Sequence, residues 1–446
     1  MKNFLILFLI IISLNILSCE KKEEPLNVIL ITIDTLRADH LSCYGYNRKT
    51  SPNMDKIARS GVLFLNTVAS SSFTPPSMAT IFTSRYPSSH GVKHGVFKKD
   101  KVFNQEVLSG SIQTLAKVLK ENGYATYGFH TNPHLSKDFG FAQGFDTFKQ
   151  FTFDDAMNLN IKILGDIDKI RSAGKYFLWV HYFDPHWPYL KREPWLSEYS
   201  SFTPGERDEP GYIDPPEKFS KANNLQNNSK LLSYIVARYD SEINYVDGYV
   251  KELLNFFKPD SNTLVVIASD HGEEFFEHNC FTHGQQLYEE SIKVPLIIYA
   301  PSKFPANIKI KQQVGIIDIM PTILDILKIK SRQRLSGESL LPLISGNKKE
   351  ERVLYSELAR LGKDFVSAKL KNWKYIYDVN TNMEELYDLS SDAGEKKNIV
   401  SANEKLAADF RAKVKSLLLS SKDVRNEEKP VNKDAVDNLK SLGYIN

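Results

Sequence analysis

Three apolar runs constrain the fold of this 446-residue chain most strongly. Residues 27–33, 176–180 and 263–269 consist almost entirely of apolar, β-branched or aromatic residues. Such continuous runs are typical of strands that are buried on both faces of a parallel sheet. The runs are followed, in chain order, by Asp34, by His181 and by the pair Asp270 and His271. Because ligands of open α/β sheets bind beyond the carboxyl ends of the strands, we expect these polar side chains to converge on one rim.

Helix signals separate these runs. Ser51-Pro52 begins one helix that Gly61 ends, 111–122 forms a second, and 231–257 forms a long third with apolar residues at helical spacing. Helices that alternate with buried strands predict a sheet covered on both faces. The connection 194–228 is rich in Pro, Ser, Asn and charge, and we interpret it as a surface excursion or a plain loop.

The length predicts two or three domains, and we expect one large and one small. After Gly346 the pattern changes to short apolar stretches that predict antiparallel strands followed by a helix. The strands are expected at 352–357, 365–370 and 374–377, and the helix at 405–419. We therefore assign residues 26–346 to the large α/β domain and residues 347–446 to a small α+β domain.

The N-terminal sequence predicts an export signal. Its apolar run 4–14 is short for a membrane span and has the proportions of a signal peptide. The run ends in Ile16-Leu17-Ser18-Cys19, which resembles a bacterial lipobox. We predict a lipoprotein signal peptide at 1–18, a lipidated Cys19 and a charged tether at 19–25, with an uncleaved anchor helix as the alternative. The protein is then expected on the bacterial cell envelope, either periplasmic or on the outer surface, attached to the membrane through its lipid anchor.

Composition excludes some functions. The net charge of +3 is small for this length, and the lysines are scattered, so we expect no nucleic-acid partner. Only Cys43 and Cys280 remain after lipidation of Cys19, which implies no disulfide framework. The sequence does not determine whether these two cysteines pair.

Thr74 is the candidate nucleophile. Pro75 and Pro76 follow it, and proline is well tolerated in the first turn of a helix, so Thr74 is expected at a helix N-terminus. The free N–H groups and helix dipole there would stabilise both an alkoxide and a phosphate or sulfate oxygen. The alternative is that Thr74 merely caps the helix.

The rim also carries residue types that bind a divalent cation. We predict Asp34, Asp270 and His271 as ligands, with Thr74 as the fourth in its alkoxide form. A cation would lower the pKa of the hydroxyl and neutralise oxygens of the ester under attack. Oxygen-rich ligation with one imidazole fits Ca, Mg, Mn or Zn.

His186 and His283 are the candidate proton donors. Both are expected on turns near the rim, where they could protonate a leaving oxygen or stabilise the charge of the transferred group. The alternative is that they are ordinary loop histidines. His181 is interpreted as a buried, structural hydrogen-bonding residue, and Arg85 as a partner either of a substrate anion or of a carboxylate in its own loop.

Ordered motifs along nearly the whole chain resemble those of the sulfatase family within the alkaline-phosphatase superfamily. They include Asp34-Thr35-Leu36-Arg37-Ala38-Asp39-His40, Thr83-Ser84-Arg85-Tyr86-Pro87, Asp184-Pro185-His186, Ser269-Asp270-His271-Gly272-Glu273 and Glu385-Leu386-Tyr387-Asp388-Leu389. The resemblance implies a large α/β domain with a central mixed, mostly parallel sheet, a small domain with an antiparallel sheet, and one divalent cation at the nucleophile.

The chain departs from the family pattern at four places. Thr74 stands where typical sulfatases carry the Cys or Ser that becomes formylglycine, and Thr cannot be converted by that route. Thr35 replaces the second Asp of an Asp-Asp pair, and the segment 128–132 lacks a Lys expected to bind sulfate. His283 replaces another Lys. These changes resemble relatives with a Thr nucleophile, in which a covalent ester is resolved by water or by another alcohol.

The sequence therefore predicts a metal-dependent hydrolase of sulfate or phosphate esters, with Thr74 as covalent nucleophile. Its substrate would be a sulfated or phosphorylated small molecule, glycan or lipid. One alternative is an envelope phosphoethanolamine- or phosphoglycerol-type transferase, and another is a non-catalytic binding lipoprotein. A second cation held by Asp184, His186 and His283 is a less favoured arrangement.

Overall fold

The computed structural model describes residues 27–205, 216–260, 262–347, 350–420, 427–431 and 433–441. The predicted signal peptide and tether lie outside these residues, so the prediction of a lipid anchor stays a prediction. Within the described ranges, every helix is too short or too polar to cross a membrane.

A nine-stranded sheet forms the centre of the large domain, in the order β12-β2-β11-β8-β1-β7-β5-β6, with β13 paired to β2. At its middle β1 (Asn27–Ile33) runs parallel to β7 (Tyr176–Tyr182) on one side and to β8 (Thr263–Ser269) on the other. Only β11 (Lys293–Tyr299) is antiparallel to its neighbours, β8 and β2. The remaining strands are β2 (Val62–Val68), β5 (Ala125–His130), β6 (Thr147–Gln150), β12 (Ile308–Ile310) and β13 (Val314–Gly315). The predicted mixed, mostly parallel sheet is confirmed.

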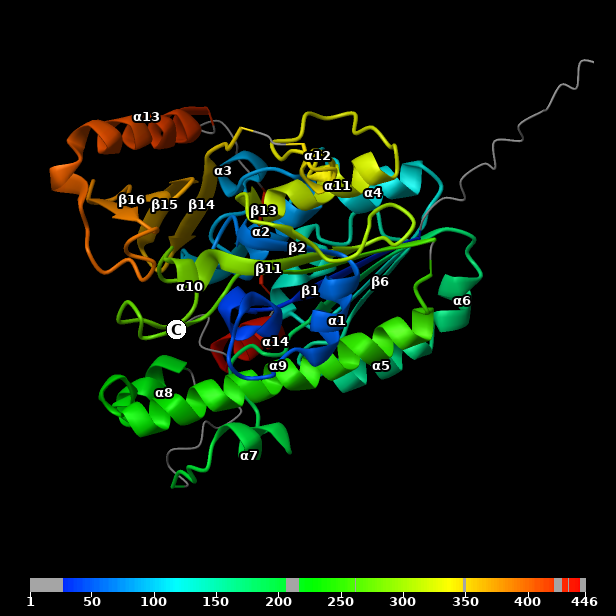
Figure 1. Ribbon diagram of the computed structural model, residues 1–446, viewed down its shortest axis with the longest axis horizontal. Helices are drawn as coiled ribbons and strands as arrows, with labels where there is room; N and C mark the ends of the chain where they lie inside the picture. The colour runs from blue at the N-terminus through cyan, green and yellow to red at the C-terminus, as the bar shows by residue number, and fades with distance from the viewer. Residues whose placement is uncertain are drawn as a thin grey trace, which may run out of the picture.

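Helices cover both faces of this sheet (Figure 1). One face packs against α2 (Thr74–Thr83), α4 (Leu115–Glu121) and α11 (Ile319–Ile326). The other packs against α1 (Pro52–Ser60), α5 (Ala156–Leu164) and α9 (Ser229–Phe257). Leu30 belongs to the first apolar cluster and Ile31 to the second. Because successive β1 side chains enter different cores, the run is apolar throughout instead of alternating.

One helix prediction and one loop interpretation need correction. The helix predicted over 111–122 begins only at Leu115, because the Thr114 side chain accepts a hydrogen bond from the Lys117 amide and caps the helix there. The connection 194–228 is not a plain loop, since it contains α7 (Trp195–Tyr199) and α8 (Pro216–Ala222).

The C-terminal region forms a second, antiparallel sheet with a helix against it. Its strands are β14 (Leu354–Arg360), β15 (Lys363–Leu370), β16 (Trp373–Asp378) and β17 (Glu384–Asp388), paired in that order. Helix α13 (Glu404–Ser420) packs on the sheet, with Phe410 stacked on Tyr375 at a centroid distance of 5.9 Å. Three of the strands and the helix were predicted, whereas β17 was not.

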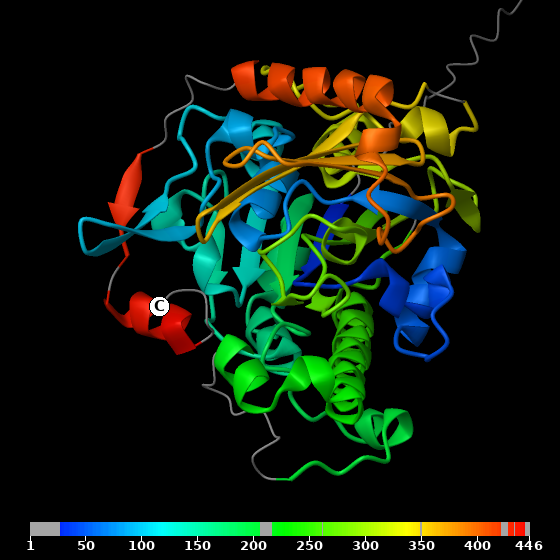
Figure 2. The ribbon, with the colours of Figure 1, turned by 90° about the vertical axis from the view of Figure 1, so that its left-hand side faces the viewer.

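The end of the described chain returns to the large domain (Figure 2). Strand β18 (Glu428–Pro430) pairs with β4 (Val102–Glu106), which also pairs with β3 (Val96–Lys99). Helix α14 (Lys433–Ser441) follows and contacts Pro133–Leu135. The last elements thus contact the large domain instead of extending the small sheet.

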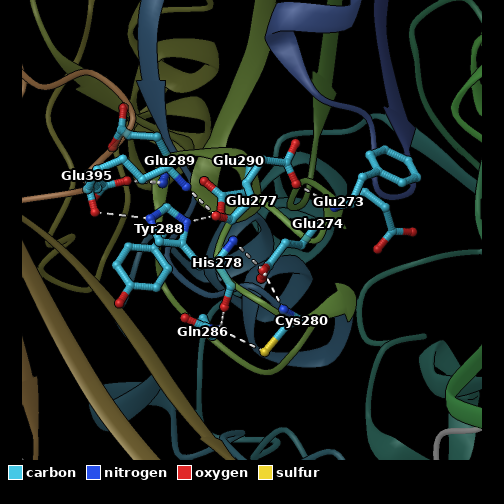
Figure 3. Close-up of polar contacts among 12 residues, drawn as sticks. Glu273, Glu274, Glu277, His278, Cys280, Gln286, Tyr288, Glu289, Glu290 and Glu395 are labelled. Atoms are coloured by element: carbon cyan, nitrogen blue, oxygen red, sulfur yellow. Dashed lines mark hydrogen bonds and ion pairs between the residues drawn. The ribbon is translucent and has the colours of Figure 1, made fainter. Parts of the chain in front are cut away.

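His278, from the large domain, contacts the segment that follows the last strand of the small sheet (Figure 3). Its Nδ1 lies 2.5 Å from Glu290 Oε1 and its Nε2 lies 3.1 Å from the backbone carbonyl oxygen of Glu395. The ring stacks on Tyr288 at 3.6 Å between centroids. A carbonyl oxygen can only accept, so Nε2 carries a proton. The short contact between Nδ1 and Glu290 Oε1 needs a second proton between these two atoms. The His278–Glu290 pair therefore holds one proton more than a neutral imidazole and a carboxylate would.

Both described cysteines are free thiols. The Cys280 thiol accepts a hydrogen bond from the Gln286 side chain at 2.7 Å (Figure 3). The Cys43 backbone amide donates to Asp55. The two cysteines are therefore not paired in this structure.

The contact between His278 and Glu290 should make the stability of the protein depend on pH. Burial lowers the pKa of His278, but the contact with Glu290 outweighs it and raises that pKa above the ordinary value of 6.5. The pair therefore stabilises the folded chain fully below that value and less as the pH rises through the folded pKa. In urea denaturation, we expect His278→Gln to lower the free energy of unfolding more at about pH 6 than at about pH 9.

His90→Gln provides the contrast. Burial lowers the pKa of His90 to about 3, so the neutral ring costs the folded chain stability at low pH, where the unfolded chain binds the proton. We therefore expect His90→Gln to lower the free energy of unfolding less at about pH 6 than at about pH 9. An equal loss at both pH values in His278→Gln would contradict the protonated pair.

Candidate active site

The predicted cation ligands and the predicted nucleophile meet at one rim of the sheet. Asp34 follows β1, Asp270 and His271 follow β8, and Thr74 is the first residue of α2; all four are fully buried. The Thr74 Oγ1 atom lies 3.4 Å from Asp34 Oδ1 and 3.1 Å from His271 Nε2. His271 Nε2 lies 3.5 Å from Asp270 Oδ2 and 3.7 Å from Asp34 Oδ1. The structure thus brings together the side chains that the sequence placed at three separate points of the chain.

The start of α2 leaves the Thr74 hydroxyl available for this cluster. The N-cap is Phe73, which has extended backbone angles and makes no side-chain cap hydrogen bond. Pro75 and Pro76 occupy the first turn, where their missing N–H groups are not needed. Thr74 is therefore not the capping residue, and its hydroxyl is directed at Asp34 and His271.

The two carboxylates at the rim are electrostatically incompatible without a cation. Burial and the negative charge of Asp34 raise the pKa of Asp270. Burial opposes ionisation of Asp34 as well, but the contact with His181 and the charges of nearby histidines keep its pKa well below the usual range. Asp270 Oδ2 has no hydrogen-bond partner among the described residues. An unsatisfied buried carboxylate oxygen beside a second carboxylate, an imidazole and a hydroxyl fits a divalent cation held by Asp34, Thr74, Asp270 and His271.

Two residues contact Asp34 in ways that the sequence did not predict. Asn132 Nδ2 donates to Asp34 Oδ2 at 2.6 Å, and His181 Nε2 lies 3.3 Å from the same oxygen. Asn132 lies in the segment that was interpreted only as lacking a Lys. His181 was recognised at a strand end but was interpreted as structural. One donor atom each from Asp34, His181 and Asp270 lie within 4.8 Å of one another.

His283 lies beside His271. Its ring centroid is 4.6 Å from that of His271, and its Nδ1 lies 2.9 Å from Glu273 Oε1. The other carboxylate oxygen of Glu273 accepts a hydrogen bond from the Tyr189 hydroxyl at 3.0 Å. Glu273 thereby fixes the orientation of the imidazole, as the third group of a catalytic triad does.

His186 lies beside His283, with 4.8 Å between the ring centroids. Its Nδ1 lies 2.5 Å from the backbone carbonyl oxygen of Trp187, so Nδ1 donates. Burial lowers the pKa of His186 to about 4 and that of His283 well below its ordinary value. Both predicted proton donors are therefore beside the cluster, and their imidazoles are neutral at neutral pH before substrate binds.

Asp184 is engaged elsewhere. Its Oδ1 accepts from Arg192 at 2.9 Å and its Oδ2 accepts from the Ala156 amide at 2.9 Å. The less favoured second cation site would need this carboxylate, and both oxygens are already bonded to protein. The Arg85 guanidinium donates to the side chain of Gln333 at 3.2 Å, which is neither a substrate anion nor a carboxylate of its own loop.

Comparison with known proteins agrees with this geometry. The sulfatase family model matches residues 26–329, and the model of the N-sulphoglucosamine sulphohydrolase C-terminal region matches residues 276–423. The chain therefore belongs to the sulfatase family, whose members are ester hydrolases.

Similar proteins extend over nearly the full length. A Delta 4,5-hexuronate-2-O-sulfatase of Bacteroides thetaiotaomicron is 24% identical over 91% of each chain. The uncharacterized sulfatase YidJ of Escherichia coli is 23% identical, over 89% of this chain and 87% of that protein. Among solved structures, a 2-O GAG sulfatase aligns with a TM-score of 0.72 and 21% identity, over 92% of this chain and 96% of its own. The phosphonate monoester hydrolase of Agrobacterium radiobacter aligns with a TM-score of 0.69 and 20% identity, over 89% and 96%.

The repulsion between Asp34 and Asp270 leads to a test of cation binding. We expect divalent cations to raise the melting temperature of the chelator-treated protein, because they bind the folded state only. Asp270→Asn removes one ligand and one of the two like charges, so it should abolish that rise and raise the melting temperature measured in chelator.

Asp247→Asn is the matched control for this measurement. Asp247 is a fully buried carboxylate on α9 that accepts from the Met54 amide, away from the rim. This variant should be less stable but should keep the cation-dependent rise. A rise of unchanged size in Asp270→Asn would contradict the assigned ligands.

Proposed function

We propose that this protein is a metal-dependent hydrolase of sulfate or phosphate esters that uses Thr74 as a covalent nucleophile. The observation that carries the proposal is the position of the Thr74 hydroxyl, which lies at a helix N-terminus and within 3.4 Å of both Asp34 and His271. A bound cation would lower the pKa of this hydroxyl and neutralise the oxygens of the ester.

The proposed reaction has two steps. Thr74 Oγ1 attacks the sulfur or phosphorus atom, the bond from that atom to the alcohol oxygen breaks, and a Thr74 ester forms. Water then attacks the same sulfur or phosphorus atom and releases Thr74 with inorganic sulfate or phosphate. The positive end of the α2 dipole supports the negative charge that develops on the transferred group.

His283 is proposed to supply a proton to the departing oxygen, with His186 beside it. The hydrogen bond to Glu273 holds the ring of His283 in one orientation, 4.6 Å from the ring of His271. When an anionic ester binds, its charge raises the proton affinity of both imidazoles, which favours donation to the leaving group.

The absence of a formylglycine precursor favours phosphate esters over sulfate esters. Formylglycine hydrate can expel sulfate through its second hydroxyl, whereas a Thr74 ester must wait for attack by water. Relatives act on sulfated sugars, as the hexuronate sulfatase does, so an acidic or sulfated glycan remains within the proposed substrate class. No specific observation favours the transferase or binding-lipoprotein alternative.

The nucleophile assignment predicts both activity and preference. With a divalent cation, the protein should hydrolyse 4-nitrophenyl phosphate or a phosphodiester faster than 4-nitrophenyl sulfate. Thr74→Ala should lower kcat by at least about 1000-fold, whereas Thr74→Ser keeps a hydroxyl and should keep part of the activity. Mass spectrometry of the quenched reaction should locate the transferred group on the peptide containing Thr74. A strong sulfate preference that Thr74→Ala removes would overturn the proposed mechanism.

The role of His283 predicts a dependence on the leaving group. His283→Gln should lower kcat about 100-fold or more for an alkyl phosphate, because a poor leaving group needs the proton. For 4-nitrophenyl phosphate the loss should be much smaller, since nitrophenolate departs without one. His94→Gln, at a partly exposed residue that bonds Glu106, serves as the control and should leave both rates unchanged. Equal losses on both substrates would assign His283 to binding instead of proton donation.

A further inference from the structure

We propose that His181 is an additional ligand of the same cation, so that the site contains two imidazoles and selects Zn²⁺ over Ca²⁺ and Mg²⁺. This inference rests on the proposed function and deepens it by naming the metal. His181 is fully buried at the end of β7, and its ring stands between Thr32 on one side and Asp34 on the other.

The hydrogen bonds of Thr32 can hold the proton of His181 on Nδ1. Trp179 Nε1, which can only donate, lies 3.0 Å from Thr32 Oγ1. The single hydroxyl proton of Thr32 is directed at the carbonyl oxygen of Val180, which can only accept, at 3.4 Å. With this orientation of the hydroxyl, Thr32 Oγ1 can accept at its second lone pair from His181 Nδ1, 2.9 Å away. A neutral imidazole that donates from Nδ1 has an unprotonated Nε2, which is the arrangement of metal-binding histidines.

In this tautomer the unprotonated Nε2 faces Asp34 Oδ2, which is also an acceptor, so a cation between them would serve both atoms. Asp34 Oδ2 is 3.3 Å away and already accepts the Asn132 amide at 2.6 Å. A charge-assisted N–H···O bond would be shorter, about 2.7–2.9 Å. Two ligands of one cation, each about 2.1 Å from it, lie about 3.0–3.4 Å apart at bond angles near 90–110°. The observed separation matches shared coordination, and the unpartnered Asp270 Oδ2 belongs to the same group of donor atoms.

A second imidazole changes which cation the site prefers. Ca²⁺ and Mg²⁺ prefer oxygen ligands, whereas imidazole suits Zn²⁺ and other first-row transition metals. With His181 and His271 both present, two nitrogens join the carboxylates of Asp34 and Asp270. The donor set then resembles a zinc site more closely than a calcium site.

Metal affinity of the resting protein tests this inference. Chelator-treated wild type and His181→Gln would be titrated with Zn²⁺ and with Ca²⁺ against a competing chelator. Gln can still donate a hydrogen bond toward Asp34, so loss of a mere positioning contact should cost little. Loss of a ligand should lower Zn²⁺ affinity by more than about 100-fold, beyond the range typical of outer-shell changes, and leave Ca²⁺ affinity within about 10-fold.

His130→Gln is the matched control, because His130 is the register partner of His181 on β5 and is equally buried. Its ring stacks on Trp179 at 5.5 Å, and its Nδ1 bonds the backbone oxygen of Asn132. This variant should retain the Zn²⁺ affinity of the wild type. X-ray absorption of the Zn²⁺-loaded wild type should show two imidazoles, and this measurement decides the question even if His181→Gln does not fold.

Unchanged Zn²⁺ affinity in a folded His181→Gln variant, or a single imidazole by X-ray absorption, would overturn the inference. These measurements use no substrate, so they are independent of turnover. Full activity in Thr74→Ala would overturn the proposed function while leaving the count of imidazoles unaffected.

Discussion

The burial of Asp34 and Asp270 beside each other is the constraint on which the rest of the site depends. Both side chains are fully buried at the ends of adjacent parallel strands. Two carboxylates without water repel each other and lose their hydration, and such a pair persists only where positive charge compensates it. Two surrounding groups serve that need: the amide of Asn132 donates a hydrogen bond to Asp34, and the N-terminus of α2 contributes the positive end of its dipole.

Strand register delivers these groups to one place. In β1 and β7, Thr32 is level with His181, and in β1 and β8, Ile33 is level with Ser269. Asp34 and Asp270, which follow Ile33 and Ser269, therefore leave the sheet at the same level, next to His181. A shift of one residue would turn every side chain to the opposite face, but each face packs against its own apolar core, which prevents the shift. The packing of the two apolar cores thus also fixes the relative positions of the side chains at the rim.

The parts of this arrangement that sequence could predict are those set by local pattern. Strands 27–33 and 263–269 have the predicted bounds, because continuous apolar runs have few alternatives inside an α/β domain. Thr74 was found because prolines mark helix starts. Asn132 and Glu273 were not assigned roles, since their contacts with Asp34 and His283 depend on tertiary approach between segments roughly 100 and 10 residues apart and leave no periodic signal. The pairing of β18 with β4 joins segments more than 300 residues apart and was missed for the same reason.

The return of β18 to β4 gives the small sheet a second attachment. A domain that hangs on one connection can rotate about it, as hinge-closing enzymes do around their ligands. Here the chain enters the small sheet after α12 (Leu341–Ile344) and is fixed again to the large domain beyond α13, where β18 pairs with β4. His278 adds a further contact through the backbone carbonyl oxygen of Glu395. Because the small sheet is held at several points along the chain, we expect it to keep its position relative to the large domain instead of rotating about a single connection.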